Sequence, residues 1–214
     1  MTNFPEFKAS GTRSVEARPD TKRRRVLAAA TGIVGGAGIA AASIPFVASM
    51  LPSQRARAGG APVDADFDKL GPGEQVTFEW RGKPLWILRR TGAMLKALES
   101  PAHRAKLADP DSRVKGQQPT YARNTFRSIK PDYLVLVPVC THLGCVPTFR
   151  PEVAPLDLGP EWPGGYFCPC HGSKFDFSGR VYRNVPAPIN LVVPPHRYQS
   201  ATVVRIGEDP ERAI

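Results

Sequence analysis

All four cysteines of this 214-residue chain lie in two short segments, and each segment also carries a histidine. Box one is CTHLGC at 140–145, and box two is CPCHGSKF at 168–175. A fold that uses both boxes together must bring two loops, separated by residues 146–167, into one place. The boxes offer six side chains able to bind a metal: Cys140, His142, Cys145, Cys168, Cys170 and His171.

Three uses of these six side chains compete. A structural zinc site takes four Cys and His ligands, but a C-x-H spacing is unusual for zinc, and two cysteines would stay unexplained. Two disulfides suit an exported protein, but they leave both histidines without a purpose. A two-iron, two-sulfur cluster can take two cysteines on one iron and two histidines on the other. One Cys and one His of each box then act as ligands, and the remaining two cysteines can pair.

The N-terminal part of the chain predicts export and a membrane anchor. Arg23 and Arg24 stand ahead of an apolar run, which is the twin-arginine export pattern. Residues 26–51 contain no charged side chain. As a helix of about 39 Å they would exceed the ~30 Å hydrocarbon core of a bilayer. The basic residues at 22–25 predict that segment 1–25 is cytoplasmic and that the rest crosses a bacterial inner membrane once, with its head in the periplasm.

Cleavage of this run as a signal peptide is the alternative, because ARA at 56–58 resembles a small-residue cleavage site. The run is longer than the usual apolar region of a signal peptide, which favours a retained anchor. Residues 52–62 are rich in Pro, Gly and small residues and predict a flexible tether. From residue 58 onward, 20 Lys/Arg are nearly balanced by 16 Asp/Glu, so no nucleic-acid partner is expected.

The head, residues 63–214, predicts a mostly β fold of short antiparallel strands and Pro-rich loops. Within residues 74–90, apolar residues recur at alternate positions in two runs, one on each side of RGKP. This pattern predicts a hairpin. An apolar run at 132–140 ends at the first cysteine, and 190–207 predict two further strands. One helix is expected at 91–100 with Thr91 as its N-cap, and 101–128 as loop or weak helix.

The two boxes resemble the cluster-binding boxes of the Rieske iron–sulfur proteins of respiratory cytochrome bc complexes. PAPINLVVP at 186–194 is similar to that family's proline loop and the strand after it. The resemblance covers nearly the whole chain. It implies an antiparallel β-sandwich head with a small cluster-binding subdomain at about 134–190, preceded by one transmembrane helix. It also implies one 2Fe–2S Rieske cluster as the cofactor.

The resemblance assigns roles to individual residues. Cys140 and Cys168 would bind one iron, and His142 and His171 the other. Cys145 and Cys170 would form a disulfide that joins the loops. The residues expected around the cluster are Leu143 as a shield, Gly144 and Gly172 to let backbone N–H groups approach sulfur, Ser173 as a hydrogen-bond donor, Phe175, and the proline loop Pro186, Ala187 and Pro188.

The resemblance to this family implies that the chain is the electron-transfer subunit of a proton-translocating quinol:cytochrome c oxidoreductase. Cytochrome b and a cytochrome c-type subunit would be its partners, and a quinol its substrate. His171 would accept a hydrogen bond from the quinol hydroxyl and then its proton, while the cluster takes one electron.

Three alternatives use the same sequence features differently. The first is the small subunit of an exported arsenite-oxidase-like enzyme. A ring-hydroxylating oxygenase needs a second iron site, for which His103 and His196 are too few. A zinc-stabilised binding module is the third.

Three features depart from the family pattern. The segment between the boxes, 146–167, is long and Pro-rich. Val185 stands where the family has a glycine ahead of its Pro-Ala-Pro. Phe175 stands where many members have a tyrosine that donates a hydrogen bond to a ligand thiolate, so the sequence predicts a lower reduction potential than in those members.

Overall fold

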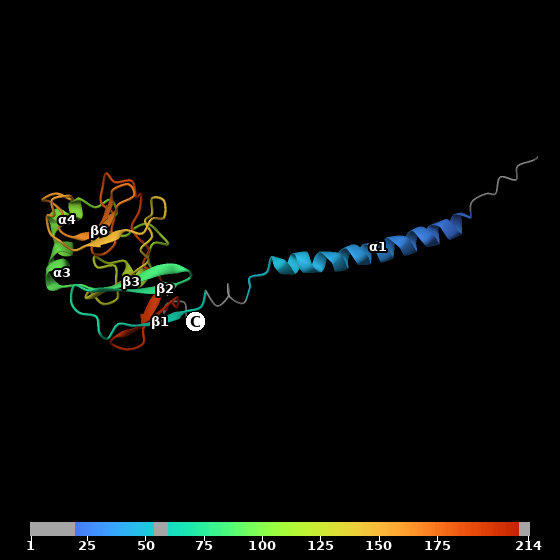
Figure 1. The fold of residues 1–214 in the computed structure, drawn as a ribbon, viewed down its shortest axis with the longest axis horizontal. Helices are drawn as coiled ribbons and strands as arrows, with labels where there is room; N and C mark the ends of the chain where they lie inside the picture. Colours follow the sequence, from blue (N-terminus) through green and yellow to red (C-terminus); the bar gives the residue numbers. More distant parts are fainter. Residues whose placement is uncertain (1–19, 54–59, 210–214) are drawn as a thin grey trace, which may run out of the picture. The chain divides into compact units, whose positions relative to one another are not determined.

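The chain divides into an N-terminal helical unit, residues 1–52, and a β-rich head, residues 53–214. The computed structural model describes residues 20–53 and 60–209. Helix α1 spans Thr21–Ser49 (Figure 1). It begins after Asp20, whose carboxylate accepts hydrogen bonds from the amides of Lys22 and Arg23. Its 29 residues would span about 44 Å, and none of its side chains is buried within the structure. The predicted apolar helix is confirmed, and by length and composition it could cross a membrane.

Parts of two predicted segments fall outside the described residues. These parts are residues 1–19 of the N-terminal segment and residues 54–59 of the tether. The boundaries proposed for the cytoplasmic segment, the anchor and the tether therefore remain predictions.

Two three-stranded antiparallel sheets form the base of the head. The first contains β1 (Val63–Asp66), β9 (Val203–Ile206) and β8 (His196–Tyr198), in that order. The second contains β2 (Gln75–Trp80), β3 (Lys83–Arg89) and β4 (Tyr133–Leu136). The predicted hairpin is confirmed as β2 and β3, and the two residues of its turn, Arg81 and Gly82, both have positive φ. Such turns match the right-handed twist of the paired strands.

The second sheet separates two apolar cores, as a sandwich requires. Successive side chains of a strand point to opposite faces. On β3, Trp86 and Leu88 enter the core that contains Cys140 and Cys168, whereas Leu85 and Ile87 enter the core under the β1–β9–β8 sheet. On β4, Leu134 and Leu136 face the cysteine core, and Val135 faces the other core. Burial on both faces explains why these strands are continuously apolar in sequence.

A third antiparallel sheet lies in the cluster-binding region. It contains β5 (Thr148–Arg150), β6 (Gly165–Cys168) and β7 (Ser173–Phe175), with Cys168 opposite Ser173. Residues 169–172 of box two are therefore the loop of the β6–β7 hairpin. Box one lies between the end of β4 and the start of β5. The β fold predicted for the head is confirmed.

The helices of the head match the prediction closely, whereas one strand does not. Helix α3 (Gly92–Glu99) has Thr91 as its N-cap, and α4 (Pro101–Ala105) and the short η1 (Thr120–Ala122) interrupt an otherwise irregular stretch (Figure 1). The two strands predicted within residues 190–207 are confirmed as β8 and β9, but the strand that the resemblance implies directly after the proline loop is reduced to the isolated bridge between Val137 and Val192. Pro194 and Pro195 have no amide hydrogen to donate, so the strand begins only at His196.

Candidate metal centre

The two boxes fold into turns of the same kind. In box one the amide of Gly144 donates to the carbonyl of Cys140 at 2.9 Å, and in box two the amide of Gly172 donates to the carbonyl of Cys168 at 2.9 Å. Both glycines have positive φ, 87° and 78°. A Cβ at either position would meet open space, so the backbone conformation requires glycine and close packing does not. From the sequence, these glycines were expected to let backbone N–H groups approach sulfur. Their own amides donate instead to the carbonyl oxygens of Cys140 and Cys168.

A disulfide between Cys145 and Cys170 joins the boxes, as the family resemblance implies. Cys140 and Cys168 are free and buried, so the described residues do not support the alternative of two disulfides. The sulfurs of Cys145, Cys168 and Cys170 lie within 4.8 Å of one another. Because two of these sulfurs share the disulfide, this group cannot act as a three-thiolate metal site.

The two free thiols lie side by side in the core. Burial raises the pKa of the Cys168 thiol, and the neighbouring Cys140 thiol acts in the same direction. The backbone amides of Cys170 and His171 oppose this shift by hydrogen bonding to the Cys168 sulfur. A metal ion would replace the thiol proton and supply the positive charge that a buried thiolate needs.

The box histidines complete a donor set of two sulfurs and two nitrogens. The rings of His142 and His171 lie 4.8 Å apart at 90° to each other. Nδ1 of His142 is buried and has no hydrogen-bond partner among the described residues. A buried ring nitrogen without a partner is costly unless it binds something, and a metal would satisfy it. The donor set therefore fits a cluster with two thiolate and two imidazole ligands.

The remaining histidines are elsewhere. His103 contacts Asp176 at 3.1 Å, and Nδ1 of His196 lies 2.8 Å from the carbonyl oxygen of Pro194. The structure thus pairs the six predicted side chains across the two boxes, Cys145 with Cys170, Cys140 with Cys168 and His142 with His171, and places both other histidines elsewhere.

The proline loop is attached to both boxes by hydroxyl groups. The Ser173 hydroxyl accepts a hydrogen bond from the amide of Ala187 at 3.0 Å, which leaves its own proton available to donate. The hydroxyl of Thr141 donates to the carbonyl of Ile189 at 2.6 Å. Sequence analysis missed Thr141, although a hydroxyl residue directly after a candidate ligand was the available signal.

Replacing Ser173 with alanine should loosen the proline loop. The variant leaves the buried Ala187 amide without its acceptor, which costs about 1–3 kcal/mol in the free energy of unfolding. Urea unfolding measures the loss, and amide hydrogen exchange at Ala187 should become faster. Unchanged protection of that amide would show that the bond contributes nothing to holding the loop.

Exposed apolar and proline residues surround the box histidines. Leu143, next to His142, is 73% exposed, and Val146 is 49% exposed. Pro169, Pro186 and Pro188 are also exposed, as is His171 itself. One imidazole is therefore accessible in loops that also expose apolar and proline side chains.

The two departures beside the boxes are apolar and packed. Phe175 is fully buried in the core that contains Cys140 and Cys168, and Val185 packs against the same core. Neither side chain carries a hydrogen-bonding group.

The long segment between the boxes is folded back on β5. Arg150 makes a bidentate ion pair with Asp157 at 2.7 and 2.9 Å and also contacts Glu152. The indole of Trp162 donates to the carbonyl of Arg150 and packs near the ring of Tyr182. Local ion pairs and one buried aromatic side chain thus order this Pro-rich insertion.

Two family descriptions match this chain. The "Rieske [2Fe-2S] domain" matches residues 62–195, and the "Ubiquitinol-cytochrome C reductase Fe-S subunit TAT signal" matches residues 14–53. The first match confirms the predicted cluster, and the second confirms the predicted twin-arginine signal.

Similar proteins include three named ubiquinol-cytochrome c reductase iron-sulfur subunit. The protein from Allochromatium vinosum is 58% identical over 187 residues, which are 87% of this chain and 89% of that protein. The protein from Blastochloris viridis is 42% identical and covers 88% of this chain and 94% of its own length. The protein from Bradyrhizobium diazoefficiens is 38% identical, with shares of 86% and 94%.

These matches extend along both the N-terminal segment and the head, and they favour the respiratory interpretation over an arsenite-oxidase-like subunit or a zinc module. The chain belongs to the family of Rieske iron–sulfur subunits of ubiquinol-cytochrome c reductase.

Proposed function

We propose that this chain takes an electron from a quinol and passes it to a c-type haem, through a 2Fe–2S centre held by the two boxes. Cys140 and Cys168 would bind one iron, and His142 and His171 the other. The observation that carries the proposal is the donor set itself, with two buried free thiols, two adjoining imidazoles and one buried ring nitrogen without a partner.

The protein's own residues define how the centre would meet its substrate. When bound, the centre supplies a one-electron acceptor, with a potential raised by its two neutral imidazole ligands. The exposed His171 accepts a hydrogen bond from the quinol hydroxyl, and its ring nitrogen Nε2 takes the proton. An imidazole that binds metal through Nδ1 leaves Nε2 free for this role.

The surroundings of His171 suit a transient contact with an apolar partner. Leu143 and Val146 are exposed beside the boxes and would exclude water from the quinol hydroxyl once they are covered. We infer that cytochrome b covers this surface during quinol oxidation and that the c-type cytochrome covers it when the electron leaves.

The N-terminal unit would hold the head at the membrane. Helix α1 has the length and composition of a membrane span, and the matched twin-arginine signal directs export. By the positive-inside rule, the basic residues at 22–25 would keep the N-terminus in the cytoplasm and send the head into the periplasm across a bacterial inner membrane. The tether between α1 and the head would let the head move between its two partners.

A rapid-mixing experiment on the assembled complex tests this function. Ubiquinol should reduce the centre in one turnover, and oxidised cytochrome c should then reoxidise it, both seen by electron paramagnetic resonance. A centre that stays oxidised in the presence of quinol would contradict the proposal.

Replacing Phe175 with tyrosine should raise the reduction potential of the centre. A hydroxyl at this buried position could donate a hydrogen bond to a ligand sulfur, and such a bond favours the reduced form because it carries more negative charge. If the bond is worth about 0.5–1.5 kcal/mol more in the reduced state, the potential rises by roughly 20–65 mV. Protein-film voltammetry measures the change, and a potential that stays the same or falls would refute this argument.

A further inference from the structure

A buried turn below box two carries an excess of positive charge. The turn, residues 176–180, follows β7 directly. Among the described residues, Arg90, Arg127 and Arg180 are at most 3% exposed, and the only buried carboxylate is that of Asp176. Three buried guanidinium groups are thus accompanied by one buried carboxylate, and of the three only Arg180 is in contact with it.

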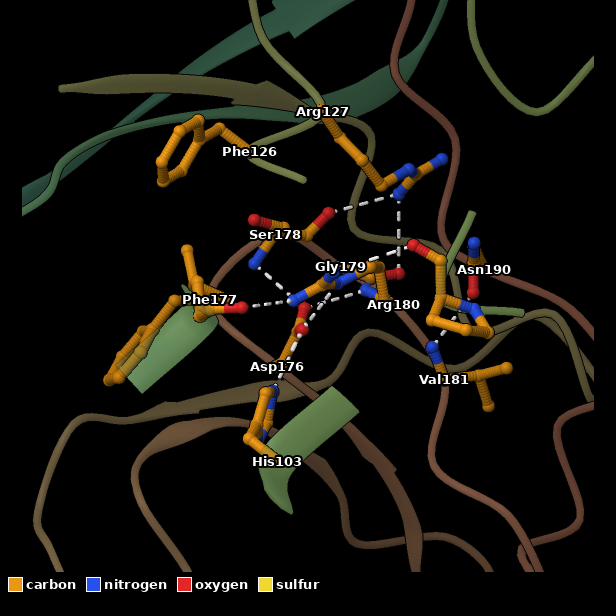
Figure 2. A network of polar contacts seen from close by, with 12 residues as sticks. His103, Phe126, Arg127, Asp176, Phe177, Ser178, Gly179, Arg180, Val181 and Asn190 are labelled. Carbon is orange, nitrogen blue, oxygen red and sulfur yellow. Dashed lines mark hydrogen bonds and ion pairs between the residues drawn. The ribbon is translucent and has the colours of Figure 1, made fainter. Parts of the chain in front are cut away.

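Arg180 and His103 both contact the carboxylate of Asp176 (Figure 2). One oxygen lies 2.7 Å from Nε of Arg180 and 3.1 Å from Nε2 of His103. The other accepts hydrogen bonds from the amides of Ser178 and Arg180, each at 2.8 Å. Burial raises the pKa of the Asp176 carboxyl, but the charge of Arg180 and the His103 contact outweigh it, so the pKa is lowered and the group is ionised.

Arg127 forms no ion pair with a carboxylate among the described residues. Its guanidinium donates to the carbonyls of Ser178 and Gly179 at 3.0 and 3.3 Å (Figure 2) and to that of Leu191 at 2.7 Å. Its Nε has no partner among the described residues. Burial lowers the pKa of Arg127 to about 10, which leaves it protonated at neutral pH.

Arg90 reaches the same turn from the end of β3. It donates to the hydroxyls of Ser178 and Ser128 at 2.9 and 2.8 Å and to the carbonyl of Phe126 at 2.8 Å. Burial lowers its pKa to about 10 as well. Among the described residues, the hydrogen-bond partners of these two buried guanidinium groups are therefore hydroxyl and carbonyl oxygens.

The turn is close to the ligands of the centre. Asp176 packs against Gly165, where an added Cβ would lie 3.1 Å from the Asp176 Cα. Gly165 and Cys168 are the two ends of β6, which corresponds to about 10 Å at the rise of a strand. Phe177 and Leu191 belong to the same apolar core as both free cysteines, so this core connects the turn with the ligands.

We propose that Arg90 and Arg127 raise the reduction potential of the iron–sulfur centre by stabilising its reduced form through the core. The electron that arrives from the quinol lowers the charge at the centre by one unit, and a buried positive charge favours that change. For a separation on the order of 10–15 Å between a guanidinium group and the centre, and an effective dielectric constant of ~20, one unit charge shifts the ratio of reduced to oxidised centre by roughly tenfold. This inference rests on the ligand set and the function proposed above.

The test is a redox titration of the full chain, purified in detergent with its centre. Arg127→Met removes the charge and keeps much of the volume, and it should lower the potential by about 59 mV, the equivalent of tenfold for one electron. Asp176→Asn removes the opposite charge and should raise the potential. Arg127→Lys keeps the charge and should stay close to the wild type. Arg123→Gln, four residues away on the same segment but exposed, should change nothing.

The opposite signs separate electrostatics from loosened structure. Shifts of Arg127→Met and Asp176→Asn in the same direction, or no shift in either, with an intact spectrum, would overturn the inference. If Arg127→Met fails to fold, Arg90→Met takes its place with the same expected direction. A wild-type chain without a Rieske spectrum would instead contradict the ligand set and the proposed function.

Discussion

Replacing His171 with alanine should abolish the iron–sulfur centre while leaving the head folded. His171 is exposed in the β6–β7 loop and belongs to neither apolar core, so its removal takes little from the packing. The ligand set loses one of the two nitrogens that bind the same iron, and a metal site of four protein ligands tolerates such a loss poorly. His142→Ala should have the same effect. In the wild type, Nδ1 of His142 is buried without a hydrogen-bond partner among the described residues, which is expected of a metal ligand.

Iron and acid-labile sulfide counts together with electron paramagnetic resonance measure the loss, and circular dichroism reports the fold. His196→Gln is the matched control, because it changes a buried histidine outside the boxes. That control should retain the spectrum, even if its stability falls. A His171→Ala chain with a full Rieske-type spectrum would show that the ligand assignment is wrong.

Removing the disulfide should cost a large part of the head's stability. Cys145 and Cys170 are 25 residues apart in sequence, and closing a loop of this length is worth about 3–4 kcal/mol in the chain-entropy model. The bond is also the covalent link between the boxes, so its loss frees both turns to move apart. We expect Cys145→Ala to lower the midpoint of urea unfolding and the occupancy of the centre.

A set of three variants isolates the bond itself. Cys145→Ala, Cys170→Ala and the double variant all remove the same disulfide, so the double variant should be no less stable than either single one. Additive losses would mean that each thiol contributes separately, and unchanged stability in all three would mean that the bond does not stabilise the head.

The site could be predicted because all of its candidate ligands lie within two short segments of the sequence. Six uncommon side chains occupy two short boxes, and few metal centres use two thiolates and two imidazoles with a cysteine to spare in each loop. The hairpin at 75–89 and the helix capped by Thr91 were predictable for local reasons, since a turn pair and an N-cap act over a few residues.

Other features were missed, some because they depend on contacts between distant segments and others because a local signal received too little weight. The charge of Arg127 is satisfied by carbonyls more than fifty residues away, at Ser178 and Leu191, and in sequence it looks like any surface arginine. The strand expected after the proline loop failed because Pro194 and Pro195 outweigh the apolar pattern before them. The role of Thr141 became visible only once the proline loop was placed beside box one.

The most direct test of the central claim is pulsed electron paramagnetic resonance of the reduced full chain, labelled with nitrogen-15 histidine, together with metal analysis. We expect two iron atoms and two labile sulfides per chain, with strong couplings to two inequivalent histidine nitrogens that vanish in His142→Ala and His171→Ala. Zinc in place of iron, or a spectrum with couplings to one histidine or none, would contradict it.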